Sequence, residues 1–307
     1  MTGSPFLEVA VFGLSDGAVF GLLALGLVLI YRTTGVLNFA HWAIGLLAVV
    51  AYIALTGVGL PALLAAAISV PVSVVGGVLA YRMVFRKVSR VNQVIVILIA
   101  IGVAQLYSSL ASFALGFQEF TRLEPWLPPG DLRFGGSVVS VSELITAGLA
   151  VAVAFGFLVW FRTSRTGRAL RAVAQNREAA VLAGIDDVKY SQIAWGIGSA
   201  LAALALLMVL PHGPGGEGGV LTPFHITPLG TLLIPAFGAA LIGGLVHLPL
   251  ALAGGFVFGL ARELLILAPQ PFSDLRSVIA ALLIVVLLLI RTERFFTTSQ
   301  EREALEA

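Results

Sequence analysis

The sequence predicts an all-α membrane protein, a polytopic bundle of transmembrane helices, from its high apolar content, its low charge and its long apolar runs. Of 307 residues, 59% are hydrophobic and 11% are charged, whereas soluble domains carry about 25% charged residues. The mean hydropathy is +1.02. So few polar side chains cannot cover a soluble core of this size. The high pI of about 9.2 does not indicate nucleic-acid binding, because the basic residues lie beside apolar runs.

Nine stretches are candidates for membrane spans, and six of them approach or reach the roughly 20 apolar residues that cross a bilayer. The other three are shorter or are interrupted by glycine and proline. We expect about nine spans, and eight if one weak stretch is re-entrant. The six stronger stretches are 10–31, 61–81, 92–115, 143–161, 190–210 and 277–290, and the weaker ones are 38–57, 229–246 and 248–268.

Basic residues predict the orientation, because loops rich in Lys and Arg stay in the cytoplasm. They gather within 82–90, 162–189 and 291–302, with Arg32 beside them. Nine spans then give an outside N-terminus and a cytoplasmic C-terminus. No basic residue precedes the first apolar run, so we expect 10–31 to be a retained span rather than a signal peptide. The Pro- and Gly-rich segments 116–142 and 211–228 fall outside.

Enzyme signatures are missing from the sequence. There is no cysteine, no P-loop motif and no H-E-x-x-H metal motif, and the four histidines are scattered. The letters Gly13 to Gly17 match G-x-S-x-G, but they lie in an apolar helix rather than in the strand-turn-helix that this motif requires. We expect no catalytic group, no metal and no cofactor bound by this chain.

A polar segment, 162–190, interrupts the apolar runs of what we expect to be a single domain, 1–307. Thr163 or Ser164 can cap a helix, and Gly184 suits a C-terminal cap before Asp186 or Asp187 caps the next span. Apolar and polar residues alternate at helical spacing, which predicts short surface helices broken at the glycine. Two functions fit this pattern: binding to anionic headgroups, or docking of a cytoplasmic partner.

The string Glu178-Ala179-Ala180-x-x-x-Gly184 resembles the EAA loop of ABC importer permeases. Three further blocks are similar to the branched-chain amino acid ABC transporter permease family of LivH/LivM type, in the family's order and spacing. They are Thr166 to Asn176, Gly21 to Gly26 with Tyr31 to His41, and the glycine-rich stretch Phe237 to Gly259. The chain departs from the family pattern at Trp42 and Ala43, and at 245–249.

This resemblance implies a permease subunit in the cytoplasmic (inner) membrane that imports branched-chain or other hydrophobic amino acids. It implies two cytoplasmic ABC ATPase subunits that bind ATP-Mg, a second related permease and an external substrate-binding protein. Relatives also carry amides and urea, so another small solute is an alternative. A secondary transporter acting alone would require inverted repeats and midplane charges, which are not evident. The residues assigned to ATPase coupling are Arg168, Arg171, Glu178, Ala179, Ala180 and Gly184.

Four polar residues within the apolar runs are candidates for the translocation pathway. Asp16 lies about 10 Å into its run, at about 1.5 Å per residue, where a charge must face protein or water. Asn38 and His41 are three residues apart and are expected on one helix face. Gln105 belongs to a polar face of its span. Packing inside the bundle is the alternative for each, and Arg262 is expected to pair with Glu263.

Glycines recur at four-residue spacing in two of the runs. Small residues at this spacing allow transmembrane helices to approach closely. We therefore expect helix packing at Gly13, Gly17, Gly21, Gly255 and Gly259, with a pathway lined by exposed carbonyls as the alternative.

Overall fold

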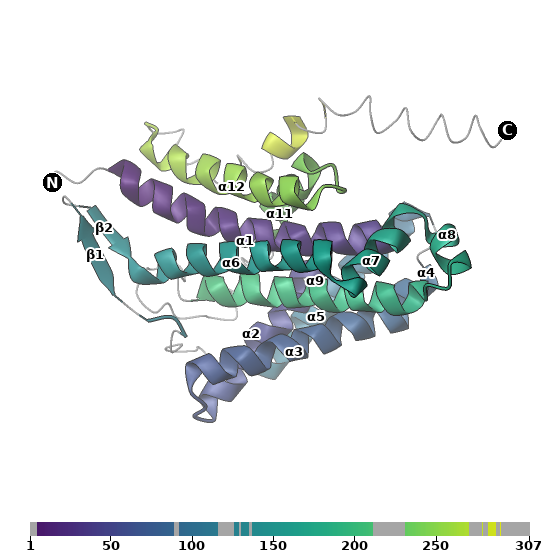
Figure 1. The fold of residues 1–307 in the computed structure, drawn as a ribbon. Coiled ribbons are helices and arrows are strands. Elements are labelled where there is room, and N and C mark those ends of the chain that lie inside the picture. The colour runs from purple at the N-terminus through teal and green to yellow at the C-terminus, as the bar shows by residue number, and fades with distance from the viewer. Residues whose placement is uncertain are drawn as a thin grey trace.

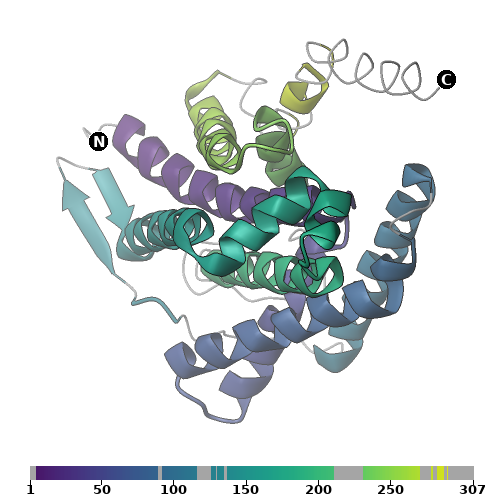
Figure 2. The same ribbon diagram turned by 45° about the vertical axis from the view of Figure 1, so that its right-hand side comes forward.

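The computed structural model describes residues 5–88, 92–115, 126–128, 130–134, 137–210 and 231–269, together with 278, 282–286 and 289. Long helices run side by side in this part of the chain, with one helix, α1, in their middle (Figure 1, Figure 2). The helices are α1 (Pro5–Thr34), α2 (His41–Gly57), α3 (Ala62–Ala80), α4 (Arg86–Val88), α5 (Gln93–Leu115), α6 (Val141–Thr163), α7 (Arg165–Gln175), α8 (Arg177–Leu182), α9 (Asp187–Val209), α11 (Leu233–Ile242) and α12 (Leu248–Leu264).

Helix α1 is the axis of the bundle. In its apolar 18-residue stretch 89% of the residues are buried, and the helix packs against α6, α9, α11 and α12. A helix that is apolar all round and enclosed by other helices needs no polar face. Its side chains, with Leu22 and Leu25 fully buried, form the largest apolar cluster together with residues such as Phe258 of α12.

Six helices of the described chain are long and apolar enough to cross a membrane. Five correspond to the stronger predicted runs, and the sixth, Leu248–Leu267, corresponds to the weak run 248–268. The weak runs 38–57 and 229–246 give shorter apolar helices, His41–Gly57 and Leu233–Ile242. Half of the predicted run 277–290 lies outside the described residues.

A two-stranded antiparallel hairpin shows that the all-α prediction was incomplete. Strands β1 (Asp131–Phe134) and β2 (Ser137–Ser140) pair with Asp131 opposite Ser140. The two valines of β2 alternate between exposed and buried, which is the two-residue period of a strand on a surface. The Glu8 carboxylate of α1 accepts a hydrogen bond from the Val138 amide at 2.8 Å, which ties the hairpin to the bundle.

The chain continues from α3 through a π-helical turn, η1 (Tyr81–Phe85). The rings of Tyr81 and Phe85 lie against Trp195 of α9, with centroids 5.8 and 4.6 Å apart. All three side chains are buried. This aromatic cluster fixes the end of α3 against the first half of α9.

Hydrogen bonds from side chains to backbone carbonyls also join the helices. Ser73 of α3 donates to the carbonyl of Ile44 at 2.8 Å, with the carbonyl of Ser199 as a second acceptor at 3.1 Å. Tyr107 of α5 donates to Gly76 of α3 at 2.9 Å. Such bonds satisfy polar side chains that have no water in an apolar bundle.

Candidate functional site

Two short helices, α7 and α8, project from the end of the bundle where α4 also lies, opposite the start of α1 and the hairpin (Figure 1). The Ser164 side chain caps α7 by accepting from the Gly167 amide at 2.8 Å. Asp186 caps α9 by accepting from the Lys189 amide at 3.0 Å. Both caps were predicted from the sequence and are confirmed.

The break between the two helices lies at Asn176, whereas the sequence predicted a break only at Gly184. Asn176 has an extended backbone, and its side chain caps α8 by accepting from the Ala179 amide at 2.9 Å. A side chain that replaces the missing backbone acceptor favours a new helix start. Gly184 does end α8: its φ is +79°, and the Ile185 amide bonds the Ala180 carbonyl at 2.9 Å, the pattern of a glycine C-cap.

The tip of α8 is an apolar surface without a partner within the described chain. Val181 is 49% exposed and Leu182 is 89% exposed. Glu178, Ala179 and Gly184 are exposed beside them, while Ala180 is buried and holds α8 to the bundle. A side chain as exposed as Leu182 contributes nothing to the fold, so it is available for contact with another molecule.

An ion pair fixes α8 relative to α9. The Arg177 guanidinium contacts the Asp187 carboxylate at 2.5 Å, with side chains 34% and 22% exposed. The pair closes the loop that contains Gly184, so the tip is held at both ends. Residues ten apart on two helices have no periodic signature, and sequence reasoning missed this pair.

Arg168 and Arg171 both donate hydrogen bonds back to α6, although Arg168 is exposed. Arg168 donates to the Thr163 carbonyl at 2.9 Å. Arg171 donates to the carbonyls of Phe161 and Arg162 and lies over the Phe161 ring. The last carbonyls of a helix lack intrahelical donors and carry partial negative charge, so these guanidinium groups stabilise the end of α6.

The four candidates for the pathway do not form one site, although Asp16 lies in a group of charged side chains. Asp16 of α1 forms an ion pair with Arg262 of α12 at 2.6 Å, whereas Glu263 lies 3.9 Å from Arg262. The expected Arg262–Glu263 pairing is therefore secondary. Glu263 is buried, and so is Glu143 of α6, whose carboxyl interacts with Ser15. Sequence reasoning missed Glu143, although an acid at the start of the run 143–161 was a signal for it.

Asn38 and His41 do not share a helix face, because α2 begins only at His41. The Asn38 side chain accepts from the Ala40 amide at 3.1 Å and forms a turn that ends the preceding loop. His41 is fully buried against Gly26 of α1 and lies near Gly198 of α9. Neither ring nitrogen makes a hydrogen bond of ordinary geometry, although the ring lies beside the Leu23 backbone.

Gln105 lies on the exposed face of α5, among apolar side chains such as Ile101 and Leu106. Within the described chain α5 packs mainly on α2, so most of its surface remains uncovered. Gln105 is therefore the most accessible of the four candidates for the pathway.

The glycines of α1 and α12 lie where these helices cross. A Cβ added at Gly17 would come within 2.7 Å of the Phe256 Cα, and one at Gly21 within 2.6 Å of the Leu252 side chain. On the opposite helix, a Cβ at Gly255 or Gly259 would collide with the backbone of α1. The two helices touch backbone to backbone, an approach that only small residues allow.

A buried central helix within a ring of membrane-length helices, with a capped polar loop at one end, defines a multi-pass membrane protein. The family model that describes the permease component of branched-chain amino acid transport systems matches residues 9–288. The chain belongs to this family and is a transport subunit rather than an enzyme.

Relatives agree with the family over most of the chain. The high-affinity branched-chain amino acid transport system permease protein BraD of Pseudomonas aeruginosa is 30% identical over 84% of this chain and 85% of that protein. LivH of Escherichia coli K12, with the same description, is 27% identical over the same shares. The probable branched-chain amino acid transport permease protein LivH of Methanocaldococcus jannaschii is 29% identical over 80% and 76%.

The fold also resembles a solved structure, PsaBC from Streptococcus pneumoniae in complex with Fab. The TM-score is 0.51 at 14% sequence identity, with 90% of each chain covered. At this identity the likeness concerns the fold alone.

Proposed function

We propose that this permease moves branched-chain or other hydrophobic amino acids across the cytoplasmic (inner) membrane, driven by ATP hydrolysis on partner subunits. The relatives named above support the substrate class. The proposed assembly has two cytoplasmic ABC ATPases carrying ATP-Mg, a second related permease and an extracytoplasmic substrate-binding protein. The observation that carries the coupling to an ATPase is the exposed apolar tip of α8.

The tip suits a docking role for geometric reasons. Leu182 and Val181 project from a helix of six residues whose two ends are fixed by Asn176 and Gly184. Apolar side chains on a rigid helix contribute more to binding in a cleft than mobile ones, because little conformational entropy is lost when they bind. Glu178 stands at the first turn of the same helix, where it can meet a basic group of the partner. Arg168 and Arg171 support the coupling loop from behind by holding α7 on α6.

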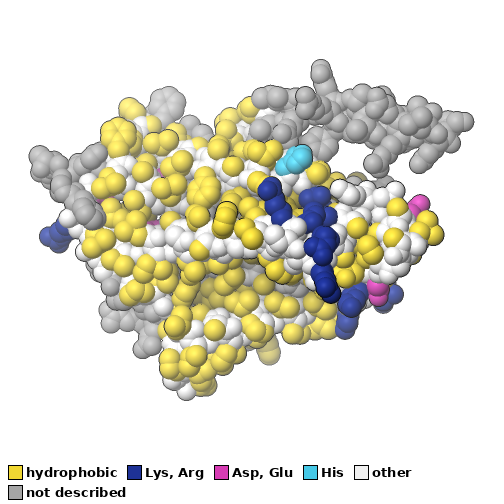
Figure 3. All heavy atoms as spheres, viewed as in Figure 1, with side chains coloured by type: hydrophobic (Ala, Val, Ile, Leu, Met, Phe, Trp, Pro, Cys, Tyr) yellow, Lys and Arg dark blue, Asp and Glu magenta, His cyan; other side chains and the backbone are white. Residues whose placement is uncertain are grey.

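The proposed orientation has nine spans, an outside N-terminus and a cytoplasmic C-terminus. The basic residues of α4 and α7 lie at the same end of the bundle as the tip of α8, and few lie on the long apolar face (Figure 1, Figure 3). Helices α1 and α12 run antiparallel, since Gly13 meets Leu260 and Gly21 meets Leu252. One domain, 1–307, then contains the coupling loop 162–190.

We place the pathway along the uncovered face of α5, between this chain and the second permease. Gln105 provides a polar group there, among side chains that suit an apolar solute. Asp16 is paired with Arg262, and Asn38 and His41 are buried. These three residues act on the pathway by setting helix positions rather than by touching the solute.

The proposed docking of α8 on the ATPase is tested by introducing or reversing a charge at the tip of α8. Leu182→Asp and Glu178→Lys should each weaken co-purification with the ATPases and lower ATP-dependent leucine uptake by about tenfold or more, the effect of losing an interface hot spot. Uptake is measured in proteoliposomes supplied with the external binding protein. Val58→Asp, at a residue 75% exposed in the α2–α3 turn, is the matched control and should leave both readouts unchanged.

Uptake that persists without ATP after Leu182→Asp would contradict the proposal and favour a secondary transporter. ATP-dependent uptake of urea or an amide, with none of leucine, would retain the coupling mechanism and overturn the substrate class.

A further inference from the structure

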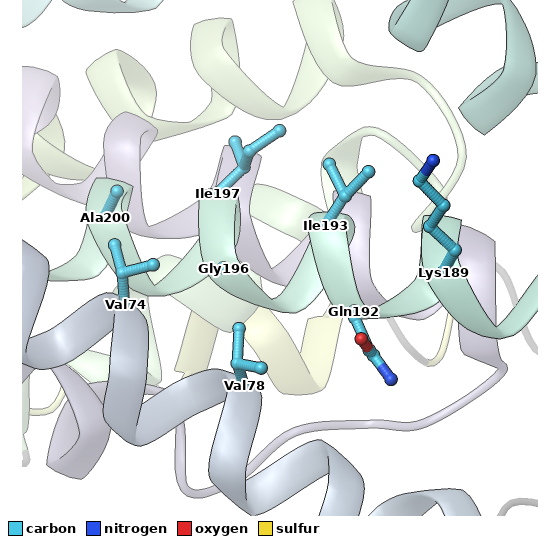
Figure 4. Close-up of a pocket in the computed structure, with 8 residues that line it drawn as sticks. All are labelled: Val74, Val78, Lys189, Gln192, Ile193, Gly196, Ile197 and Ala200. Carbon is cyan, nitrogen blue, oxygen red and sulfur yellow. The ribbon is translucent and has the colours of Figure 1, made fainter.

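An open groove of ≈ 460 Å³ runs between α3 and α9. Figure 4 shows that Val74 and Val78 project from α3 towards α9, on the side where Gly196 lies. In the same view Ile193, Ile197 and Ala200 point to the side of α9 away from Val74 and Val78, and they complete the apolar lining. The groove therefore has an apolar body along two helices that are each long and apolar enough to span a membrane.

Gly196 forms the floor of the groove. A Cβ added there would meet only the side chains of Val74 and Val78, both at 3.4 Å, which is ordinary contact. The hollow is thus the space that a side chain at 196 would fill. An added Cβ would meet no backbone atom there, so we expect a larger residue at 196 to extend into the groove.

Polar groups close only one end of the groove. Lys189 and Gln192 line that end, and Arg82 of η1 donates to the Gln192 side chain at 2.9 Å. Lys189 and Arg82 are both exposed. The guanidinium has five N–H groups, so donors remain beyond this bond.

The acidic residues nearest in sequence are already engaged. Asp186 accepts from the Lys189 backbone amide, and Asp187 pairs with Arg177. One cationic side chain, Lys189, therefore lines this end of the groove, and a second, Arg82, lies beside it on Gln192. This part of the groove lies at the end of the bundle where α4 and α7 also lie, which is where a headgroup layer meets the spans (Figure 1).

We propose that the groove binds an anionic phospholipid, with one acyl chain between α3 and α9 and the headgroup phosphate on Lys189 and Arg82. The groove is long enough to hold most of an acyl chain, because Lys189 to Ala200 on α9 covers about 16 Å at about 1.5 Å per residue. The long basic side chains can reach the interface while their apolar stems stay on the groove. Each basic residue near an anionic surface strengthens the attraction to that surface. The proposal holds whatever solute the permease carries.

The experiment measures lipid retention by native mass spectrometry on the assembled complex, titrated with phosphatidylglycerol or phosphatidylcholine. The wild-type complex should retain phosphatidylglycerol in preference to phosphatidylcholine. Gly196→Leu should reduce this retention about tenfold, because the side chain fills the groove and displaces most of an acyl chain. Ala200→Leu is a second filling variant that keeps the test valid if the first does not fold.

Further variants separate the contribution of the basic residues to lipid binding from the contribution of the apolar groove. Lys189→Gln and Arg82→Gln should each weaken phosphatidylglycerol binding about fivefold and leave phosphatidylcholine unchanged. Gly156→Leu, at a glycine of α6 with open space around it, is the control for the filling variants. Arg165→Gln, on α7 and away from the groove lining, is the control for charge. Both controls should bind like the wild type.

Equal loss in Gly156→Leu, or unchanged retention in both filling variants, would overturn the proposal. The other possible occupant is a helix of the second permease. Because the chain has no cysteine, Val74→Cys gives a clean cross-linking site. A cross-link from it to the partner permease would show that protein, not lipid, covers the groove.

Discussion

The crossing of α1 and α12 and the loop that carries α7 and α8 use small residues for opposite purposes. At the crossing, glycines remove side chains so that two backbones meet, and nothing can be added. In the loop, Gly184 has no atom within 4 Å of an added Cβ, and its value lies in a φ of +79°. The first glycines determine packing, and the second determines where a helix ends.

The α1–α12 crossing is a rigid packing contact inside the bundle, whereas the loop that carries α7 and α8 is a surface for contact with a partner. The crossing is buried and its strength comes from helix packing, whereas α8 is held by two caps and one ion pair and presents Leu182 outward. Substitutions at the crossing should therefore act on folding. Substitutions in the loop should act on partner binding while the bundle remains intact.

The largest effect is expected at the crossing. Gly255→Leu forces a side chain into the α1 backbone, and we expect a loss of about 3 kcal/mol or more in stability, at the upper end of overpacking costs. Thermal unfolding in detergent, followed by size-exclusion chromatography, measures it. Gly156→Leu should unfold near the wild-type temperature. Similar melting of the two variants would show that α1 and α12 can separate at little cost.

A smaller effect is expected for the ion pair near that crossing. Asp16→Asn should destabilise by about 1–2 kcal/mol, because Arg262 loses its closest partner within a membrane span; the exposed third of each side chain keeps this below the cost at a fully buried pair. Adding Arg262→Gln should recover part of the loss in a double-mutant cycle of melting temperatures. Strict additivity of the two single changes would argue against coupling.

Loss of a cap should act only locally. Asn176→Ala removes the acceptor for the Ala179 amide, and we expect about 1 kcal/mol less stability in α8 with an unchanged bundle. Hydrogen exchange should speed up in α8 but not in α9. Gln175→Ala, at the exposed neighbouring position, is the control and should exchange like the wild type.

The smallest effect is expected at the pair that joins α8 to α9. Arg177→Gln should cost about 0–1 kcal/mol, since both side chains are partly exposed and screened by salt. If the ion pair serves to orient the tip of α8, the single change Arg177→Gln should weaken ATPase binding. The charge swap Arg177→Asp with Asp187→Arg should then restore it. Failure of the swap together with a normal fold would mean that Arg177 itself contacts the partner.

Local features of this fold could be predicted from sequence. The caps at Ser164 and Asp186 each bind an amide three positions further along the chain, and the structure confirms them. The apolar runs predicted all six membrane-length helices, five of them from the stronger runs and one from the weak run 248–268. Helix ends were predicted less closely: the Asn38 side chain accepts a hydrogen bond from the Ala40 amide, so α2 begins at His41 rather than at 38.

Contacts between distant residues could not be predicted. Arg262 was expected to pair with its neighbour Glu263, but its closest partner is Asp16, 246 positions away. A single sequence carries no pairing signal over that distance. The exposure of Leu182 and the burial of Ala180 could not be predicted for the same reason, because both depend on how α8 lies on the bundle.

The π-helical turn at Tyr81–Phe85 amounts to one extra residue in the helix that leaves α3. Five residues of a π-turn wind through about the same angle as four residues of an α-helix, so removing one residue there would restore the α-helical ladder and leave the chain downstream in register. The change would fall on the turn itself, where Tyr81 and Phe85 contact Trp195. A single codon deletion in this stretch should therefore be tolerated better than one in the middle of α9, where every later residue of the helix would rotate by about 100°.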